Sequence, residues 1–309
     1  MGPCPAQERC AIAAAKGLSV SQVKIERPTK YLRFSRSQRV EHFILLLSFT
    51  VLGVTGLPQK WPDSWLGEAM IAGMGGIERT RIIHHVAAAT LIILTVYHFL
   101  AVAYRIWVKR ARLSMLPTFQ DVKDGLQALG YNLNVASNPP AMGRYTFGEK
   151  IEYWAVIWGT VIMIFTGYLL WNPIAATRFL PGQAIPAAKA AHGGEALLAV
   201  LAIVTWHVYH VHLKYFNRSM FTGEIARHEM EEEHSLELAE IEAGTAERPV
   251  DPVAMRRRQT VFLPVAAIVG VVLLWGTIFF LTFENTAITT IPREDIQIFT
   301  PVTPTPAEP

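Results

Sequence analysis

Histidines gathered in strongly apolar stretches are the residues of this chain whose chemistry stands out. Eight of them lie within or at the ends of such stretches: His42, His84, His85, His98, His192, His207, His210 and His212. An ionisable residue inside a membrane segment is costly and is a functional hypothesis by default. Asp, Glu and Lys are nearly absent from the interiors of these stretches, which argues against a proton relay of carboxylates. Imidazoles without carboxylates favour axial ligation of haem iron.

The spacing of these histidines predicts two ligand pairs at two depths. His192 precedes His207 by about 22 Å of helix, with about 60° of rotation between them, and precedes His210 by about 27 Å, almost in line. One helix therefore carries a ligand near each membrane face. By level, His84 pairs with His192 on the outer side. His42 pairs on the inner side with either His207 or His210.

Two further observations bear on this haem hypothesis. His98 lies about 21 Å beyond His84 on nearly the same helix face, so it is an alternative to His42 as an inner ligand. The chain has no CxxCH motif, so we expect any haem to be held non-covalently. Cys4 and Cys10 are the only cysteines, and their expected cytoplasmic position argues against a structural disulfide.

The elements that position these histidines are expected to be transmembrane helices. The 309 residues are 51% hydrophobic and 17% charged, whereas soluble domains carry about 25% charged residues. About 20 apolar residues cross a bilayer as a helix. Five stretches qualify or nearly do: 41–57, 82–104, 153–171, 193–213 and 260–283. The sequence predicts an all-α membrane protein, a four-helix di-haem bundle with a fifth C-terminal span, and shows no internal repeat.

Basic residues in the flanks predict the orientation. Lys and Arg crowd the lead-in, the connection between the second and third spans, and the segment before the fifth span, and are fewer in the opposite loops. By the positive-inside rule the N-terminus is cytoplasmic and the C-terminus lies outside a prokaryotic inner membrane. The net charge of +3 follows from this topology and gives no argument for nucleic acid.

The expected organisation has five parts. Residues 1–40 are a basic cytoplasmic segment, 41–216 the di-haem domain, 217–259 a charged cytoplasmic segment, 260–284 the fifth helix and 285–309 an outer Pro/Thr-rich tail. Within the third part, EIARHEMEEEHSLELAEIEA indicates a solvated cytoplasmic helix, with partner docking as the alternative. Arg36 and Arg39 are placed to meet inner haem propionates, with general flank charge as the alternative.

Four stretches, in order, carry a resemblance to a known family. They are LRFSRSQRVEHFILLLSFTVLGVTGLP, TRIIHHVAAATLIIL, MGRYTFGEKIEYWAVIWGTVIMIFTGYLLWNP and AAHGGEALLAVLAIVTWHVYHVH. From about Tyr31 to His234 the chain resembles the cytochrome b (gamma) subunit of respiratory formate dehydrogenases, with the cytochrome b subunits of nickel–iron hydrogenase and thiosulfate reductase as relatives. The resemblance places ligands at His84 rather than His85, at His192 and at His207. The last spacing is one residue longer than the family pattern implies, which leaves His210 open.

The resemblance also implies partners and a second cofactor. Two non-covalent b haems would pass electrons between an outer iron–sulfur or cytochrome partner, joined to a catalytic oxidoreductase subunit, and menaquinone or ubiquinone. The family's Asn and Gly at the quinone site read Thr146 and Gly148 here. The fifth span departs from the family's four helices, so the substrate of the complex is not carried over.

Two other function classes are compatible with the sequence. One is a stand-alone b-type haem oxidoreductase that acts on a small oxidant. The other is a histidine-based proton channel or transporter, which would be colourless.

Overall fold

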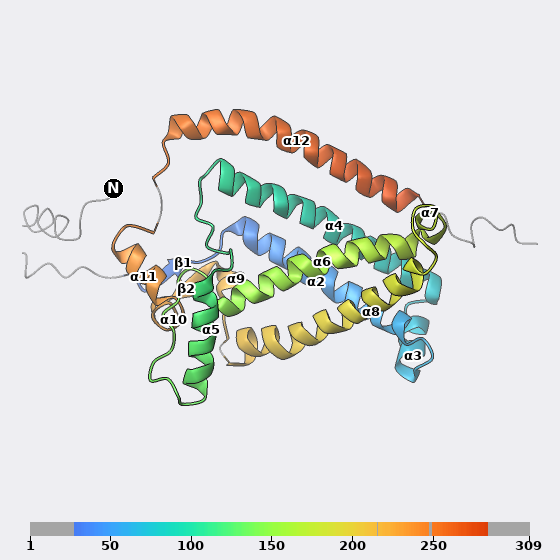
Figure 1. Cartoon of the computed structure of the whole chain (residues 1–309), viewed down its shortest axis with the longest axis horizontal. Coiled ribbons are helices and arrows are strands. Elements are labelled where there is room, and N and C mark those ends of the chain that lie inside the picture. Colours follow the sequence, from blue (N-terminus) through green and yellow to red (C-terminus); the bar gives the residue numbers. More distant parts are fainter. Residues whose placement is uncertain (1–27, 215, 247–248, 284–309) are drawn as a thin grey trace, which may run out of the picture.

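Five long helices dominate the computed structural model, which describes residues 28–214, 216–246 and 249–283 (Figure 1). They are α2 (Arg36–Lys60), α4 (Ile77–Trp107), α6 (Phe147–Trp171), α8 (Ala184–Ala202) and α12 (Pro252–Thr282). Two π-helical segments, η2 (Ile203–His207) and η3 (Tyr209–Lys214), continue α8. Each of the five is long and apolar enough to cross a membrane. The prediction of an all-α membrane protein with a fifth C-terminal span is confirmed. Cys4, Cys10 and the tail 285–309 lie outside the described residues.

The helices pack as two neighbouring pairs with a fifth helix at the side. α2 lies along α4, and α6 lies along α8, while α2 also contacts α8. α12 lies along α4 at the edge of the bundle (Figure 1). Its Gly270 approaches Leu100 closely, since a Cβ there would lie 3.4 Å from that side chain. The fifth span is therefore an addition to a four-helix core.

Two of the spans begin at residues that form capping boxes. Ser35 caps α2 through a capping box with Gln38, and Thr146 caps α6 in the same way with Glu149. In each box the hydroxyl accepts from a backbone N–H and the longer side chain accepts from the cap N–H. These caps fix where α2 and α6 start, and so fix the depth of the residues that follow.

Short elements distinguish the two ends of the bundle (Figure 1). At one end, which we call the α3 end, lie α3 (Trp65–Gly73) and α7 (Pro173–Ala176). At the other, the capped end, lies α5 (Phe119–Asn132), which follows α4 in the chain and runs across the bundle beside the start of α6. The capped end also carries α9 (Ser219–Thr222), α10 (Arg227–Glu233), α11 (Ser235–Glu242) and two strands.

The two strands join distant parts of the chain at the capped end. β1 (Lys30–Leu32) pairs antiparallel with β2 (Glu224–Ala226), with Tyr31 opposite Ile225. Ile225, Met230 and Leu238 form a small buried cluster beneath them. The segment that the sequence indicated as a solvated helix is therefore a folded cap with its own core. The sequence interpretation took the charged residues of this segment to be solvated, whereas some of them are buried.

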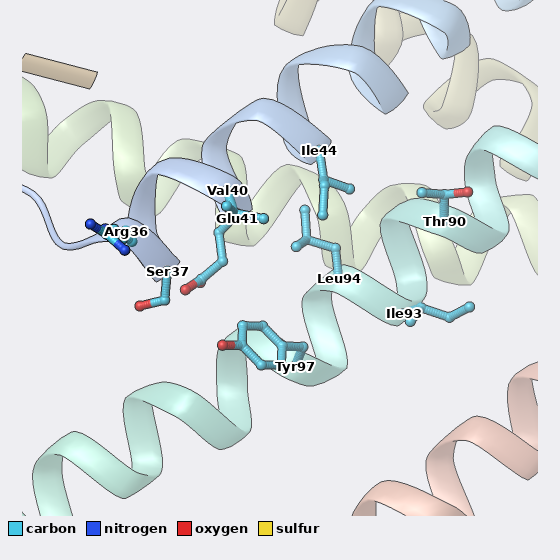
Figure 2. Close-up of a pocket in the computed structure, with 9 residues that line it drawn as sticks. All are labelled: Arg36, Ser37, Val40, Glu41, Ile44, Thr90, Ile93, Leu94 and Tyr97. Carbon is cyan, nitrogen blue, oxygen red and sulfur yellow. The ribbon is translucent and has the colours of Figure 1, made fainter. Parts of the chain in front are cut away.

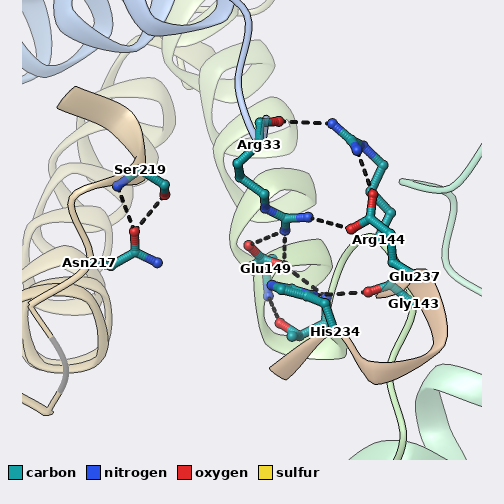
Figure 3. Close-up of polar contacts among 9 residues, drawn as sticks. Arg33, Gly143, Arg144, Glu149, Asn217, Ser219, His234 and Glu237 are labelled. Carbon is teal, nitrogen blue, oxygen red and sulfur yellow. Dashed lines mark hydrogen bonds and ion pairs between the residues drawn. The ribbon is translucent and has the colours of Figure 1, made fainter. Parts of the chain in front are cut away.

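A cluster of ion pairs fastens this cap to the bundle (Figure 3). Arg33, 3% exposed, donates to Glu237 at 3.0 Å and to Glu149 at 3.1 Å. Arg144 donates to the other oxygen of Glu237 at 2.6 Å. The buried His234 ring lies 2.9 Å from the Gly143 carbonyl, to which Nδ1–H donates. β1, the start of α6 and α11 are thereby held together.

Candidate functional site

At the α3 end, histidines from α4 and α8 face each other across the bundle. The ring centres of His84 and His192 are 6.4 Å apart, with 64° between the ring planes. Each ring is held by a threonine of the adjacent helix. Thr55 Oγ1 lies 2.8 Å from Nδ1 of His84, and Thr166 Oγ1 lies 2.9 Å from Nδ1 of His192. We call these two histidines the α3-end pair.

The threonine hydroxyls define which ring nitrogen carries the proton. Thr55 donates its hydroxyl proton to the Val51 carbonyl at 2.6 Å, and Thr166 donates to the Ile162 carbonyl at 2.6 Å. A hydroxyl has one proton, so the threonine oxygen is left to accept from Nδ1–H of the histidine. The Nε2 lone pair then remains available. A neutral imidazole with Nδ1–H held and Nε2 free is the form that binds a metal.

A glycine follows each threonine and lets the ring approach the helix. A Cβ at Gly56 would lie 3.0 Å from Cε1 of His84, and one at Gly167 would lie 3.3 Å from Cε1 of His192. α2–α4 and α6–α8 therefore use the same Thr-Gly and His arrangement, a structural repeat that we did not expect from the sequence.

At the capped end, His42 of α2 faces His207 of η2. Their ring centres are 6.3 Å apart, with 36° between the planes. Nδ1 of His207 lies 2.8 Å from Oε2 of Glu152 on α6, so the carboxylate accepts from Nδ1–H and leaves Nε2 free. We call His42 and His207 the capped-end pair.

Both pairs fit a metal held between two imidazoles. A metal–imidazole bond of about 2 Å, plus about 1.2 Å from nitrogen to ring centre, separates two trans rings by about 6.4 Å. The observed separations are 6.4 Å and 6.3 Å. Within residues 28–214, 216–246 and 249–283, no three His, Cys, Asp or Glu side chains converge as ligands of a bare metal ion. The donor set is thus one of histidine pairs.

The π-helix explains how His207 reaches this position. A continuous α-helix would turn His207 about 60° from His192, but a π turn takes in about one extra residue, equivalent to about 100°. η2 ends at His207 and so brings its face to about 40° on the other side of His192. The predicted rotation of about 60° assumed an unbroken α-helix, which the π-helical segment η2 interrupts.

Four span histidines belong to neither pair. His212 lies beside the capped-end pair, with 6.5 Å between its ring centre and that of His207 and 85° between the planes. The other three have different surroundings. Both nitrogens of His98 are engaged, Nδ1 by Glu41 at 2.8 Å and Nε2 by the Tyr153 hydroxyl at 2.9 Å. His85 stacks on Trp171 at 3.3 Å between ring centres. His210 donates from Nδ1 to its own helix at the Trp206 carbonyl, 2.9 Å away, and packs on the Trp206 ring. None of these three faces a second histidine as the two pairs do.

The residues expected at the quinone and propionate sites also lie at the capped end. Thr146 caps α6, and Gly148 faces η2, since a Cβ there would lie 3.8 Å from the Trp206 ring. Arg39 donates to the Phe221 carbonyl at 2.6 Å, which ties it to α9. Arg36 is exposed and lies at a cavity between α2 and α4.

This cavity has a volume of about 550 Å³, within the range of about 300–1,000 Å³ typical of small-molecule sites (Figure 2). Its lining is largely apolar, with a polar end at the start of α2: Arg36, Ser37, Val40, Glu41, Ile44, Thr90, Ile93, Leu94 and Tyr97. Oε1 of Glu41 is buried without a hydrogen-bond partner at that end. The cavity therefore suits an amphiphile with a compact polar head.

Sequence reasoning missed Thr55, Thr166 and Glu152. The repeated Thr-Gly pair near the end of two apolar stretches was an available signal for the threonines. Glu152 gave no such signal, because the predicted third span began at residue 153 whereas α6 begins at Phe147. The expectation that carboxylates are nearly absent from the span interiors therefore did not include Glu152, which contacts His207.

Comparison with known proteins gives three informative relatives and no matching protein-family model. The chain is 25% identical over 191 residues to the formate dehydrogenase cytochrome b556(fdo) subunit of Escherichia coli, covering 60% of this chain and 80% of that subunit. It is 25% identical over 198 residues to the formate dehydrogenase cytochrome b556 subunit of Haemophilus influenzae, covering 62% and 74%. The nitrate-inducible formate dehydrogenase cytochrome b556(Fdn) subunit of Escherichia coli is 20% identical over 231 residues, covering 74% and 97%. The resemblance seen in the four helix motifs is thus confirmed: this multi-pass membrane chain is a relative of the formate dehydrogenase cytochrome b subunits.

Proposed function

We propose that the chain is a di-haem b-type membrane subunit that carries electrons between a partner on one face and the membrane quinone pool. The observation that supports this proposal is the arrangement of four histidines in two facing pairs, with 6.4 Å and 6.3 Å between the ring centres. The relatives' printed names, cytochrome b556 subunits, support haem b as the cofactor. His84 with His192, and His42 with His207, would hold the two haem groups. Bound haem supplies reversible one-electron transfer at iron.

The chain's own residues orient and hold the groups that such haems need. Thr55, Thr166 and Glu152 fix the ring orientation and tautomer of three of the four histidines. Gly56 and Gly167 allow two of the rings to lie against the helix backbone. We infer that Arg36 remains available for a propionate or another anionic group, whereas Arg39 is bound to α9 of the cap.

The orientation in the membrane is part of the proposal. The positive-inside rule assigns the capped end to the cytoplasm and the α3 end to the outside of a prokaryotic inner membrane. The partner is then an iron–sulfur or cytochrome subunit at the α3 end, linked to a catalytic subunit. The names of the relatives support formate dehydrogenase as the kind of complex.

The quinone, menaquinone or ubiquinone, is proposed to bind at the capped end. Its reduction takes two electrons and two protons, and the protons come from the cytoplasm in this orientation. Thr146 and Gly148 form one place for the ring, beside the helix that carries His207. The cavity of about 550 Å³ between α2 and α4 is a second place, since Glu41 at its polar end precedes His42 in the chain.

The test is a reduced-minus-oxidised spectrum of the purified chain together with its haem content. We expect a b-type α band and two haems per chain, as determined by pyridine haemochrome. His84→Ala and His42→Ala should each remove one haem, whereas the matched control His210→Ala should retain both. A colourless chain would support the channel or transporter class instead. Retention of both haems in His84→Ala would contradict the α3-end pair.

A further inference from the structure

The two histidine pairs differ in the charge of the groups that hold them. In the α3-end pair both Nδ1–H groups donate to neutral threonine hydroxyls, Thr55 at 2.8 Å and Thr166 at 2.9 Å. In the capped-end pair the Nδ1–H of His207 donates to the Glu152 carboxylate at 2.8 Å. The same ligand type thus has a neutral partner at one site and an anionic partner at the other.

We propose that Glu152 is a positioning residue that lowers the reduction potential of the haem held by His42 and His207. This inference rests on the proposed function, since it concerns the group that the capped-end pair would hold. Thr55 and Thr166 do not lower the reduction potential of the haem of the α3-end pair in this way. This contact makes the capped-end haem harder to reduce than it would be without the carboxylate.

Two physical effects act in the same direction. A carboxylate that accepts from Nδ1–H makes the imidazole a stronger electron donor to the iron, which favours the oxidised metal. The oxidised iron also carries one more positive charge than the reduced iron, so a nearby anion stabilises it by Coulomb attraction. A threonine hydroxyl orients the ring but adds no net charge.

The position of Glu152 limits the screening by solvent of its electrostatic effect on the haem. Its side chain is 26% exposed and that of His207 is 27% exposed, so most of the contact lies away from water. Glu152 belongs to the second turn of α6, whose start is fixed by the Thr146 capping box. The carboxylate is therefore held at the level of His207 by a rigid element and not by a loop.

A redox titration of the full chain carrying its haems, followed at the α band, tests the proposal. Glu152→Gln keeps the size of the side chain and an acceptor oxygen but removes the charge. We expect the potential of the capped-end haem to rise and that of the α3-end haem to stay unchanged. The low-spin ferric electron paramagnetic resonance signal of the capped-end haem should shift as well, since its ligand field weakens.

Glu41→Gln is the matched control. Glu41 is also a carboxylate near the capped-end pair, but its hydrogen bond goes to His98, which belongs to neither pair. It should leave the paramagnetic resonance signal unchanged and move the potential less than Glu152→Gln does. Equal changes in the two variants would show a general effect of charge and would overturn the assignment to the Glu152–His207 hydrogen bond.

Other outcomes separate this inference from the proposed function. If the chain holds two haems and Glu152→Gln changes neither their potentials nor their resonance signals, the inference is contradicted but the proposed function is not. If that variant loses the capped-end haem, Glu152→Asp takes its place, because the shorter side chain weakens the hydrogen bond but keeps the charge. A raised potential in Glu152→Asp supports the inference, and an unchanged one overturns it. A wild-type chain without haem contradicts the proposed function itself.

Discussion

Arg33 and Glu237 form a buried ion pair, 3.0 Å from Nη1 to Oε2, that ties the segment between β1 and the first span to α11 beyond the fourth. Their side chains are 2% and 8% exposed. Arg33→Met leaves a buried carboxylate with one fewer partner, and we expect a loss of about 3–5 kcal/mol in the stability of the cap. Thermal unfolding of the purified chain measures this loss. The control is Arg112→Met, which removes an exposed pair with Glu240 and should cost about 0–1 kcal/mol. Equal losses in the two variants would contradict the burial argument.

The cap should also weaken in acid through His234. Burial first, and then the charge of Arg33, lower the pKa of His234 below its ordinary value of 6.5. The unfolded cap therefore binds more protons below pH 6.5, so the contribution of His234 is complete above that pH and is lost as the pH falls toward the lowered pKa. After correction for the intrinsic, base-catalysed rate of amide exchange, the protection of amides in α10 and α11 should fall as the pH drops below about 6.5. His234→Gln should flatten this dependence, and an unchanged slope would assign it to another group.

Removing either threonine of the α3-end pair should weaken haem binding there. Thr55→Val and Thr166→Val keep the side-chain shape but leave Nδ1–H without its acceptor. Loss of such an outer contact lowers metal affinity by about 10- to 100-fold. Haem content after dilution or competition with a haem acceptor measures the change. Thr95→Val is the control, because that hydroxyl donates to its own helix at Leu91 and contacts neither pair.

A methyl group added to either close-approach glycine should disturb the same pair. Gly56→Ala would place a Cβ 3.0 Å from the His84 ring and should displace it, with partial loss of the α3-end haem. Gly276→Ala in α12 is the control, since nothing lies within 4 Å of a Cβ there. Because Ala favours helix by about 1 kcal/mol over Gly, the control should be at least as stable as the wild type. A haem spectrum unaffected by Gly56→Ala would show that the ring does not need this approach.

Filling the α2–α4 cavity tests whether it holds the quinone. Ile93→Trp adds bulk in the lining, and we expect slower reoxidation of the haems by a short-chain quinone, with unchanged haem content. Ile82→Trp is matched, since Ile82 is an exposed residue of the same helix outside the lining. Normal reoxidation in Ile93→Trp would place the quinone at Thr146 and Gly148 instead.

The five spans and the levels of the histidines were predictable because both depend on local composition and a fixed rise per residue. The rotation of His207 was not, because an apolar π turn has no pattern that separates it from an α turn. Glu152 was missed because capping at Thr146 extends α6 beyond its apolar core. The cap was missed because Arg33 meets Glu237 across 204 residues of sequence, a pairing that no local signal encodes.

The β1–β2 pairing has a consequence for how the chain is made. Tyr31 accepts a hydrogen bond from Arg227 at 2.7 Å, and 196 residues separate the two. β1 leaves the ribosome first, yet its partner strand emerges after four spans have been synthesised. Since pairings between distant segments form late, β1 remains without its partner strand while those spans enter the bilayer. Closure of the cap therefore requires that the four spans between the two strands have already been synthesised.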